Sequence, residues 1–222
     1  YQSMQDASGA ELNTAVGNNA MRGTIDVDIT GDYNTAVGAG SLKVIKTGDK
    51  NTAIGTYALF DLTTGNSNNV MGYEAAQNIT NGNYNVAIGN HTLNANNSGD
   101  DNVAIGNSAL YSNTSSDNTA VGFNALYNTN ASNNVGIGWK AGNEISSGTD
   151  NVVIGYNASV GTATANNQIV IGSGATGLGV NTAVIGPAAT TTIYASEDAG
   201  AYIYGAGMKV ADGSDLTIGN EN

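Results

Sequence analysis

The sequence lacks several features that would narrow down its chemistry or its surroundings. It has no cysteine among its 222 residues, so no disulfide stabilises the fold and the cysteine count gives no redox compartment. No apolar run approaches the roughly 18 residues of a membrane-spanning helix, and nothing at Tyr1 resembles a signal peptide. We therefore expect no membrane insertion in this chain, and we interpret it as a mature product or a piece of a longer protein.

Charged residues are also scarce, the basic ones most of all. Only 11% of the residues are charged, with six Lys and Arg against 18 Asp and Glu, and the formal net charge is −12. Such a chain repels nucleic acid and anionic membranes instead of binding their phosphates. Its 40% hydrophobic content excludes a disordered polar chain. We expect a folded protein with no nucleic-acid partner.

Groups for catalysis or cofactor binding are equally few. The single histidine, His91, stands in a turn where related segments of the chain have Asn, Tyr or Ser, and no constellation of catalytic groups accompanies it. The many glycines include no G-x-x-x-x-G-K-[ST] phosphate loop. We therefore expect no enzyme activity, no catalytic residue and no cofactor.

What the chain does contain is a repeat, best seen in Asn102 to Leu110, N-V-A-I-G-N-S-A-L. The glycine of this motif, termed here the repeat glycine, recurs at steps of 21, 17, 17, 17, 17, 16, 16, 17, 17 and 14 residues. A nearly fixed period of this size is typical of a solenoid, in which each unit buries its apolar face only by stacking on its neighbours. The repeat glycines are Gly17, Gly38, Gly55, Gly72, Gly89, Gly106, Gly122, Gly138, Gly155, Gly172 and Gly186.

Positions around the repeat glycine form columns of like residues. Four residues before the glycine stands Asn, which we interpret as a turn residue whose amide binds the backbone and, coil on coil, its own neighbours. The glycine allows a backbone conformation or a close approach that a side chain would forbid. Clear members of these two structural columns are Asn85, Asn102, Asn118 and Asn151, with Gly89, Gly106, Gly122 and Gly155.

Each repeat has room for two short strands. A β-rich run ending in the glycine and a second run ending in Ala-Leu predict two brief strands joined by a tight turn, with Ala and one Ile or Val pointing inward. Such a coil buries about one large side chain, worth about 1.5–3 kcal/mol, against about 1–2 kcal/mol of backbone entropy per ordered residue. A single roll is therefore marginal. We expect columns of Ala on two faces to let three chains pack around one core.

The motifs N-T-A-V-G-x-x-A-L and N-V-A-I-G-x-x-A-L, found from Asn13 to Gly186, resemble the YadA-like head repeats of trimeric autotransporter adhesins and phage tail fibres. The segment Asn167 to Ile185, N-Q-I-V-I-G-S-G-A-T-G-L-G-V-N-T-A-V-I, is similar to the closing repeats of tail-fibre proteins. The resemblance implies an all-β, left-handed parallel β-roll of about 10–11 coils, assembled as a homotrimer. The coils are longer than the usual adhesin coil, which implies side loops.

On this basis the chain divides into three regions. Residues 1–12 carry no repeat and cap the first coil or join it to a stalk, residues 13–186 form the β-roll, and residues 187–222 form a C-terminal β segment that intertwines in the trimer. This last segment begins at the only proline and is predicted to contain three strands. These strands are Thr190–Ala195, Ala201–Gly205 and Asp215–Gly219.

Two acidic patterns raise the question of a cation site. The segment Thr24–Thr30 predicts a strand by its period of two, with Ile25, Val27 and Ile29 inward, and places Asp26 and Asp28 on a solvated face without a full loop of oxygen ligands. An acidic column before the Asn column is interrupted at four coils by Tyr33, Ser67, Tyr84 and Asn133. Its members are Asp49, Asp101, Asp117 and Asp150. Acidic turn residues are common without metals, so we predict no metal site.

Aromatic residues after the repeat glycine are the best candidates for ligand binding. Rings on consecutive coils would lie about one strand spacing apart in an exposed strip. Such a strip suits a glycan, whose apolar faces stack on rings while neighbouring amides reach its hydroxyls. The alternative is a ladder that stabilises the roll or the trimer interface. The candidates are Tyr73, Phe123, Trp139 and Tyr156, with Tyr111 and Tyr127 as a second, shorter pair.

Together these features predict a non-enzymatic extracellular rod with a lateral or distal binding surface. The resemblance implies a fibre segment of a phage or phage-like tail that attaches to a cell-surface receptor, with a surface glycan as the favoured class. Two alternatives stay open. One is the head of a trimeric bacterial surface adhesin, and the other is a purely structural spacer or filament subunit without a ligand.

Overall fold

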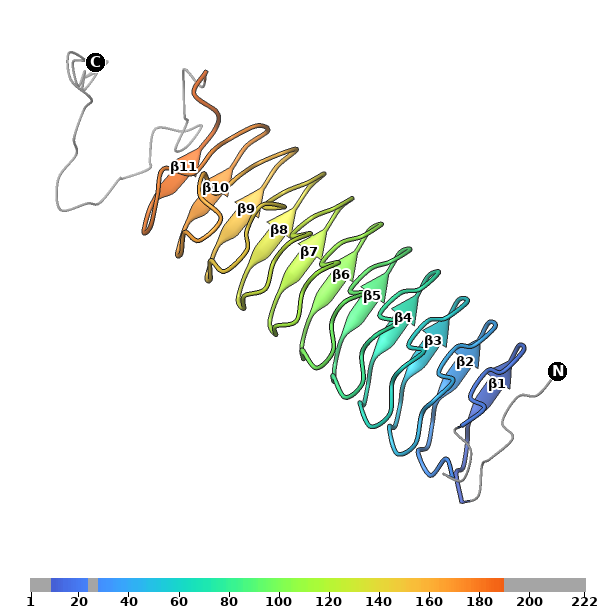
Figure 1. Cartoon of the computed structure of the whole chain (residues 1–222). Helices are drawn as coiled ribbons and strands as arrows, with labels where there is room; N and C mark the ends of the chain where they lie inside the picture. Colours follow the sequence, from blue (N-terminus) through green and yellow to red (C-terminus); the bar gives the residue numbers. More distant parts are fainter. Residues whose placement is uncertain (1–8, 24–27, 190–222) are drawn as a thin grey trace, which may run out of the picture. The chain divides into compact units, whose positions relative to one another are not determined.

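The computed structural model describes residues 9–23 and 28–189. These residues form eleven short parallel strands in one sheet, in which each strand pairs with the next along the chain (Figure 1). Most steps from one strand to the next span 17 residues, as in the pairing of Val86 with Val103. The solenoid and its period near 17 residues, predicted from the glycine steps, are therefore confirmed, as is the all-β parallel arrangement of about 10 coils that the resemblance implied. The strands are β1 Thr14–Val16, β2 Thr35–Val37, β3 Thr52–Ile54, β4 Asn69–Met71, β5 Val86–Ile88, β6 Val103–Ile105, β7 Thr119–Val121, β8 Val135–Ile137, β9 Val152–Ile154, β10 Ile169–Ile171 and β11 Ala183–Ile185.

The strands form where β-branched residues precede the repeat glycine. Ala87 and Ile88 of β5 pair with Ala104 and Ile105 of β6, so identical residues lie side by side. β-branched side chains pack well on a pleated surface, which favours the extended backbone here. Neighbouring strands of such a sheet lie about 4.8 Å apart, so the coils stack as closely as backbone hydrogen bonding permits.

The interior is filled by Ala from the strands and by Leu from the turns. Because side chains alternate along a strand, only the middle residue of each three-residue strand points inward. Ala87 and Ala104 occupy this position and are fully buried, as are Leu93 and Leu110 from the turns that follow. The prediction that Ile or Val joins Ala inside was wrong for the residue one before the repeat glycine, since Ile88 and Ile105 are 41% and 37% exposed. Val is buried where it takes the middle position of a strand, as at Val153.

The prediction of a second strand in each coil was also wrong for the described residues. The run after the glycine forms a succession of turns, and its only bridge joins Ser159 to Thr176. The reason is the left-handed backbone of its leucines, with φ of +52° at both Leu93 and Leu110. A residue in this region turns the chain and cannot extend a strand. The turns still stack through backbone hydrogen bonds, such as Leu93 N to Ala109 O at 3.0 Å.

The repeat glycine marks the closest approach between coils. Gly106 has φ of +125°, a conformation that L side chains rarely adopt. A Cβ atom on Gly106 would lie 2.6 Å from the carbonyl oxygen of Gly122 in the next coil. Any side chain here would push two hydrogen-bonded coils apart, which explains why the motif carries glycine at this corner.

The asparagines four residues before the repeat glycine form a continuous buried ladder. Asn85 Oδ1 accepts hydrogen bonds from the backbone N and from Nδ2 of Asn102, both at 3.1 Å. Its own Nδ2 donates to Asn68 Oδ1 at 3.1 Å and to the carbonyl oxygen of Gly99 at 2.9 Å. These side chains have no exposed surface. The hydrogen bonds expected of this column from the sequence are therefore present, and we call it the asparagine ladder.

Some predicted elements fall partly or wholly outside the described residues. The three strands predicted after Pro187 begin at Thr190 and lie outside them, as do residues 24–27 of the predicted strand Thr24–Thr30. In the described part of that segment, Ile29 is buried as predicted, but Asp28 to Thr30 form no strand. Thr30 N instead donates to Lys46 O at 2.7 Å, as part of a loop that stacks on the next coil.

We expect the substitution Asn85→Ala to lower the free energy of unfolding by about 2–6 kcal/mol. It leaves the buried backbone N of Asn102 and the carbonyl oxygen of Gly99 without partners, at about 1–3 kcal/mol each, whereas Asn68 Oδ1 keeps the backbone N of residue 85. The matched control is Asn107→Ala, because Asn107 is exposed and its amide oxygen accepts only from Ser108 Oγ. Urea unfolding followed by circular dichroism measures both variants. An equal loss of unfolding free energy in the two variants would contradict the stabilising role of the asparagine ladder.

Candidate functional site

Three aromatic residues that follow the repeat glycine stack on one another along consecutive coils. The ring centroids of Phe123 and Trp139 lie 6.2 Å apart at an interplanar angle of 13°, and those of Trp139 and Tyr156 lie 4.7 Å apart at 10°. The strand register places these residues one above another, because β7, β8 and β9 pair without offset. We call Phe123, Trp139 and Tyr156 the aromatic column.

The stacking decides which ring faces a ligand can reach. Phe123 and Tyr156 are 43% and 59% exposed, whereas Trp139 is partly buried between them. A sugar ring cannot stack on Trp139 because its two neighbours occupy that space. The faces that remain are the outer faces of the two end rings, so the column offers binding surfaces at its ends and along its edges.

The exposed side of the Tyr156 ring lies next to small residues of the following coil. In the next coil the residue at the same position is Ser173, followed by Gly174, and both are exposed. A Cβ atom on Gly174 would have no heavy atom within 4 Å, so the space beside it is open. Coil contact is kept by the backbone, since Gly174 N donates to Tyr156 O at 2.8 Å. Ser173 and Gly174 therefore leave room for a planar ligand to stack on the tyrosine ring.

A lysine side chain lies against the aromatic column. The Lys140 ammonium lies 4.4 Å from the centroid of the Trp139 ring, within the range of a cation–π contact. Lys140 stands two residues after the repeat glycine in a left-handed conformation, with φ of +54°. Between Lys50 and the end of the described residues it is the only Lys or Arg, in a chain of net charge −12. The aromatic column therefore carries local positive charge on an otherwise acidic body.

The other candidate aromatics lie at separate places. Tyr111 and Tyr127 stack with centroids 5.1 Å apart at 3°, but they stand five residues after their repeat glycines and not one. Tyr73 occupies the same position as the aromatic column, yet the coils of Asn90 and Asn107 separate it from Phe123. The six residues thus form three groups and not one continuous strip.

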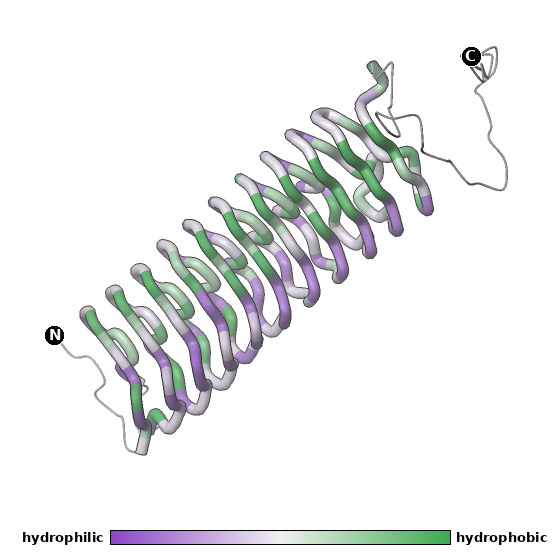
Figure 2. Tube along the Cα trace, turned by 180° about the vertical axis from the view of Figure 1, so that it is seen from behind, coloured by the Kyte–Doolittle hydropathy of each residue, from purple (hydrophilic) through white to green (hydrophobic). Residues whose placement is uncertain are grey.

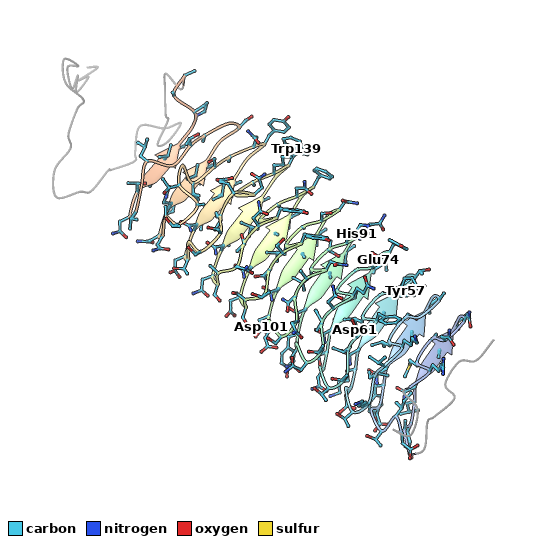
Figure 3. All side chains as sticks on the ribbon, viewed as in Figure 1. Tyr57, Asp61, Glu74, His91, Asp101 and Trp139 are labelled. Atoms are coloured by element: carbon cyan, nitrogen blue, oxygen red, sulfur yellow. The ribbon has the colours of Figure 1, made fainter. Side chains whose placement is uncertain are left out.

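Tyr73 belongs to a small polar group that the sequence did not reveal. Its ring meets the His91 ring edge to face at 5.4 Å, and His91 Nδ1 lies 3.3 Å from Glu74 Oε2. Glu74 and His91 stand two residues after successive repeat glycines, so the spacing of 17 could have shown their proximity. A hydrogen bond with Glu74 is the main cause of the raised pKa of Tyr73. Figure 3 shows Glu74, His91 and Trp139 along the same edge of the solenoid.

The acidic column predicted from the sequence is two columns in the structure. Asp101, Asp117 and Asp150 stand five residues before the repeat glycine with φ of +56° to +62°, a conformation that Asp and Asn tolerate better than most residues. Asp49 stands six residues before its glycine, and the fifth position of that coil is Lys50. The grouping of Asp49 with the other three was therefore wrong. In the described part of the chain, no three His, Cys, Asp or Glu residues are placed to hold a metal ion.

Asp49 belongs to a second ladder, which sequence reasoning missed. Its Oδ1 accepts from Asp32 N at 2.8 Å, and its own backbone N donates to Asn66 Oδ1 at 2.8 Å. Here each side chain accepts from the preceding coil, whereas in the asparagine ladder it accepts from the following one. The sequence could have predicted this second ladder, because the sixth residue before the repeat glycine is polar or acidic in coil after coil.

Comparison of the chain with protein-family models, with curated proteins and with solved structures gave no match. The described residues contain no helix long and apolar enough to cross a membrane. Any function for the chain must therefore be argued from the surfaces described above.

We expect Trp139 and Tyr156 to be energetically coupled by about 0.5–1.5 kcal/mol, because stacked aromatic pairs contribute this much beyond burial. The test is a double-mutant cycle with Trp139→Ala and Tyr156→Ala, measured by urea unfolding. The control cycle pairs Trp139→Ala with Tyr111→Ala, which belongs to another ring pair and should give additive losses. Additivity in both cycles would mean that the column contributes nothing through ring stacking.

Proposed function

We propose that this chain is a non-enzymatic, extracellular fibre segment of a phage or phage-like tail. In this proposal three copies assemble side by side into a rigid rod, and the aromatic column attaches the rod to a glycan on a cell surface. The observation that carries the proposal is the outer face of the sheet. We define the outer face as the side chains one and three residues before each repeat glycine, which point away from the core of the coil.

The outer face carries no charged residue over the full length of the sheet, and most of its side chains are Val and Ile; the polar exceptions are Thr14, Thr35, Thr52, Asn69 and Thr119. Its strands present pairs such as Val86 with Ile88 and Val103 with Ile105. Figure 2 shows hydrophobic residues of successive coils aligned in a band along the solenoid. Monomeric soluble proteins rarely expose large continuous apolar patches, and such patches mark interaction surfaces. A face of this length supports permanent cover by another protein chain.

Copies of the same chain are the partners that this face fits best. Each copy carries a net charge of −12, so identical chains repel one another except where they meet through uncharged surface. The outer face supplies such a surface, and its Val and Ile rows replace the Ala columns that the sequence had suggested for this contact. The Ala columns are fully buried inside each roll. The number of copies, three, and the left-handed course of the coils rest on the resemblance of the repeats.

Coil-to-coil hydrogen bonding supports the role of a stiff rod. Every strand between β2 and β10 is paired on both sides, and two side-chain ladders connect the same coils in opposite directions. Ten steps of about 4.8 Å give a length on the order of 50 Å. A repeat of this kind extends a fibre without a change of fold.

For receptor attachment, the preferred site for a sugar ring is the side of the Tyr156 ring that does not stack on Trp139. The apolar side of a pyranose stacks on aromatic rings, while polar groups nearby bind its hydroxyls. Asn157 and Ser173 are exposed beside the ring and offer such groups. Lys140 adds a cation that suits ring oxygens or an acidic substituent.

A second candidate is a purely structural spacer without a ligand, and the aromatic column itself favours it. Both faces of Trp139 are covered by Phe123 and Tyr156, as expected for rings whose role is to hold coils together. The head of a trimeric bacterial surface adhesin is the other alternative, which the same outer face and column would serve. A glycan experiment separates the binding proteins from the spacer.

We expect the chain to have a mass of three times 22.3 kDa in solution by light scattering. Ile105→Lys should reduce this to the mass of one chain, because it places a charge in the apolar outer face while leaving the core intact. The control Ser108→Lys adds the same charge in the turn, at the position that already holds Lys140. A monomeric unaltered chain, or a trimeric Ile105→Lys variant, would contradict assembly through the outer face.

We expect glycan arrays to identify a ligand whose affinity falls at least about tenfold in Tyr156→Ala, since loss of one ring-stacking contact is worth about 1.4 kcal/mol. Tyr111→Ala is the matched control, because it removes a stacked tyrosine from the other ring pair. Binding unaffected by Tyr156→Ala would exclude this ring as the site. The absence of any bound glycan on the array, together with polymers of the chain in electron micrographs, would favour the purely structural spacer.

A further inference from the structure

One row of the outer face differs from the other ten. Strand β4 presents Asn69 and Met71 where the other strands present Thr, Val, Ile or Ala. Asn69 is exposed, and in the part of the chain that the structure describes no hydrogen bond involves its side-chain amide. The row also holds a hollow of about 200 Å³, lined by Thr52, Ile54, Asn69, Val70, Met71 and Ile88.

An amide in this place matters once the outer face is covered, which is the assembly proposed above and on which this inference rests. Burial of an amide without a hydrogen bond is costly, so Asn69 needs a partner inside the interface. Another Asn69 is well suited, because each amide carries both donors and an acceptor. Three parallel copies related by three-fold symmetry bring their Asn69 residues to the same level. The hollow has room for water molecules, which occupy about 30 Å³ each, to complete the hydrogen bonding.

The remaining rows define the register poorly. Apart from Ala183 they repeat Val, Ile and Thr, which are uncharged and similar in shape, so a chain shifted by one coil keeps ten of the eleven rows in contact (eleven less one). After such a shift Asn69 would face the row of Val86 or of Thr52, depending on the direction. Valine offers no hydrogen bond, and threonine offers only one hydroxyl. The amide therefore distinguishes the unshifted register from its neighbours.

We propose that the Asn69 amides of three copies meet on the common axis, form the one amide layer of a largely apolar interface, and so fix the axial register and select matching chains. A single buried Asn sets register and partner in coiled coils at a cost in stability, and the same physics applies to a repeating sheet interface. The layer is thus a specificity device and not a source of stability.

The test mixes chains that differ only in the position of this amide. The double variant Asn69→Val/Val86→Asn has the same composition as the unaltered chain but carries the amide one coil later, on β5. Each chain is tagged differently, refolded alone and in an equal mixture, and analysed by native mass spectrometry. The single variant Asn69→Val and the control Thr119→Val, which removes a hydroxyl from the same position of β7, are treated in the same way.

We expect each chain alone to form trimers, and the double variant to be excluded several-fold from mixed trimers with the unaltered chain. Asn69→Val alone should melt several degrees higher than the unaltered chain, because it removes the buried amide, yet it should also be excluded from trimers that contain Asn69. Thr119→Val should mix in binomial proportions. Binomial mixing of the double variant would overturn the register layer while leaving the trimer intact. Monomers or antiparallel dimers of the unaltered chain would overturn the proposed assembly, and the layer with it.

Discussion

The structure depends on hydrogen bonds that pass from each coil to the next through the buried asparagine ladder. Asn85 alone connects the backbone of Asn102, the amide of Asn68 and the loop carbonyl of Gly99. A three-residue strand offers too few backbone bonds to hold a coil of 17 residues, so the amides bring the loop and the strand of each coil together. This requirement explains why nine successive coils, from Asn13 to Asn151, carry Asn at this position.

The ladder also explains how the rest of the coil is arranged. With the amide on the inside beside the strand, the space left over is narrow, and Ala fits there while Leu from the following turn fills the remainder. The larger β-branched residues of the strand then point outward. A coil of this size cannot bury them itself, so the apolar outer face is a direct consequence of the small interior.

The same coil-on-coil register produces the surface chemistry. Residues at equal distances from the repeat glycine lie side by side, which stacks Trp139 on its neighbours and brings His91 beside Glu74. It also joins Asp32, Asp49 and Asn66 into the second ladder. Residues that recur with the period form continuous columns along the solenoid. A residue that occurs once at its position, such as Asn69, marks a single coil.

Much of this arrangement could be predicted from the spacing alone. The period, the strand before the repeat glycine and the stacking of Asn on Asn follow from the recurrence of the motif, because equal steps bring equal residues together. The aromatic column followed for the same reason. The second ladder could have been found by the same alignment, but Asp49 was counted at the wrong distance from its glycine.

What the tertiary structure decided was the side on which each residue lies. The sequence by itself determined a parallel solenoid, since only stacking satisfies so short a repeat. It could not tell whether Ile88 or Leu93 fills the core, because both are apolar and only the left-handed turn at Leu93 folds that side chain inward. Nor could spacing show that both faces of Trp139 are occupied, which depends on how the rings turn. Periodicity fixes neighbours along the rod, whereas backbone conformation within each coil fixes inside and outside.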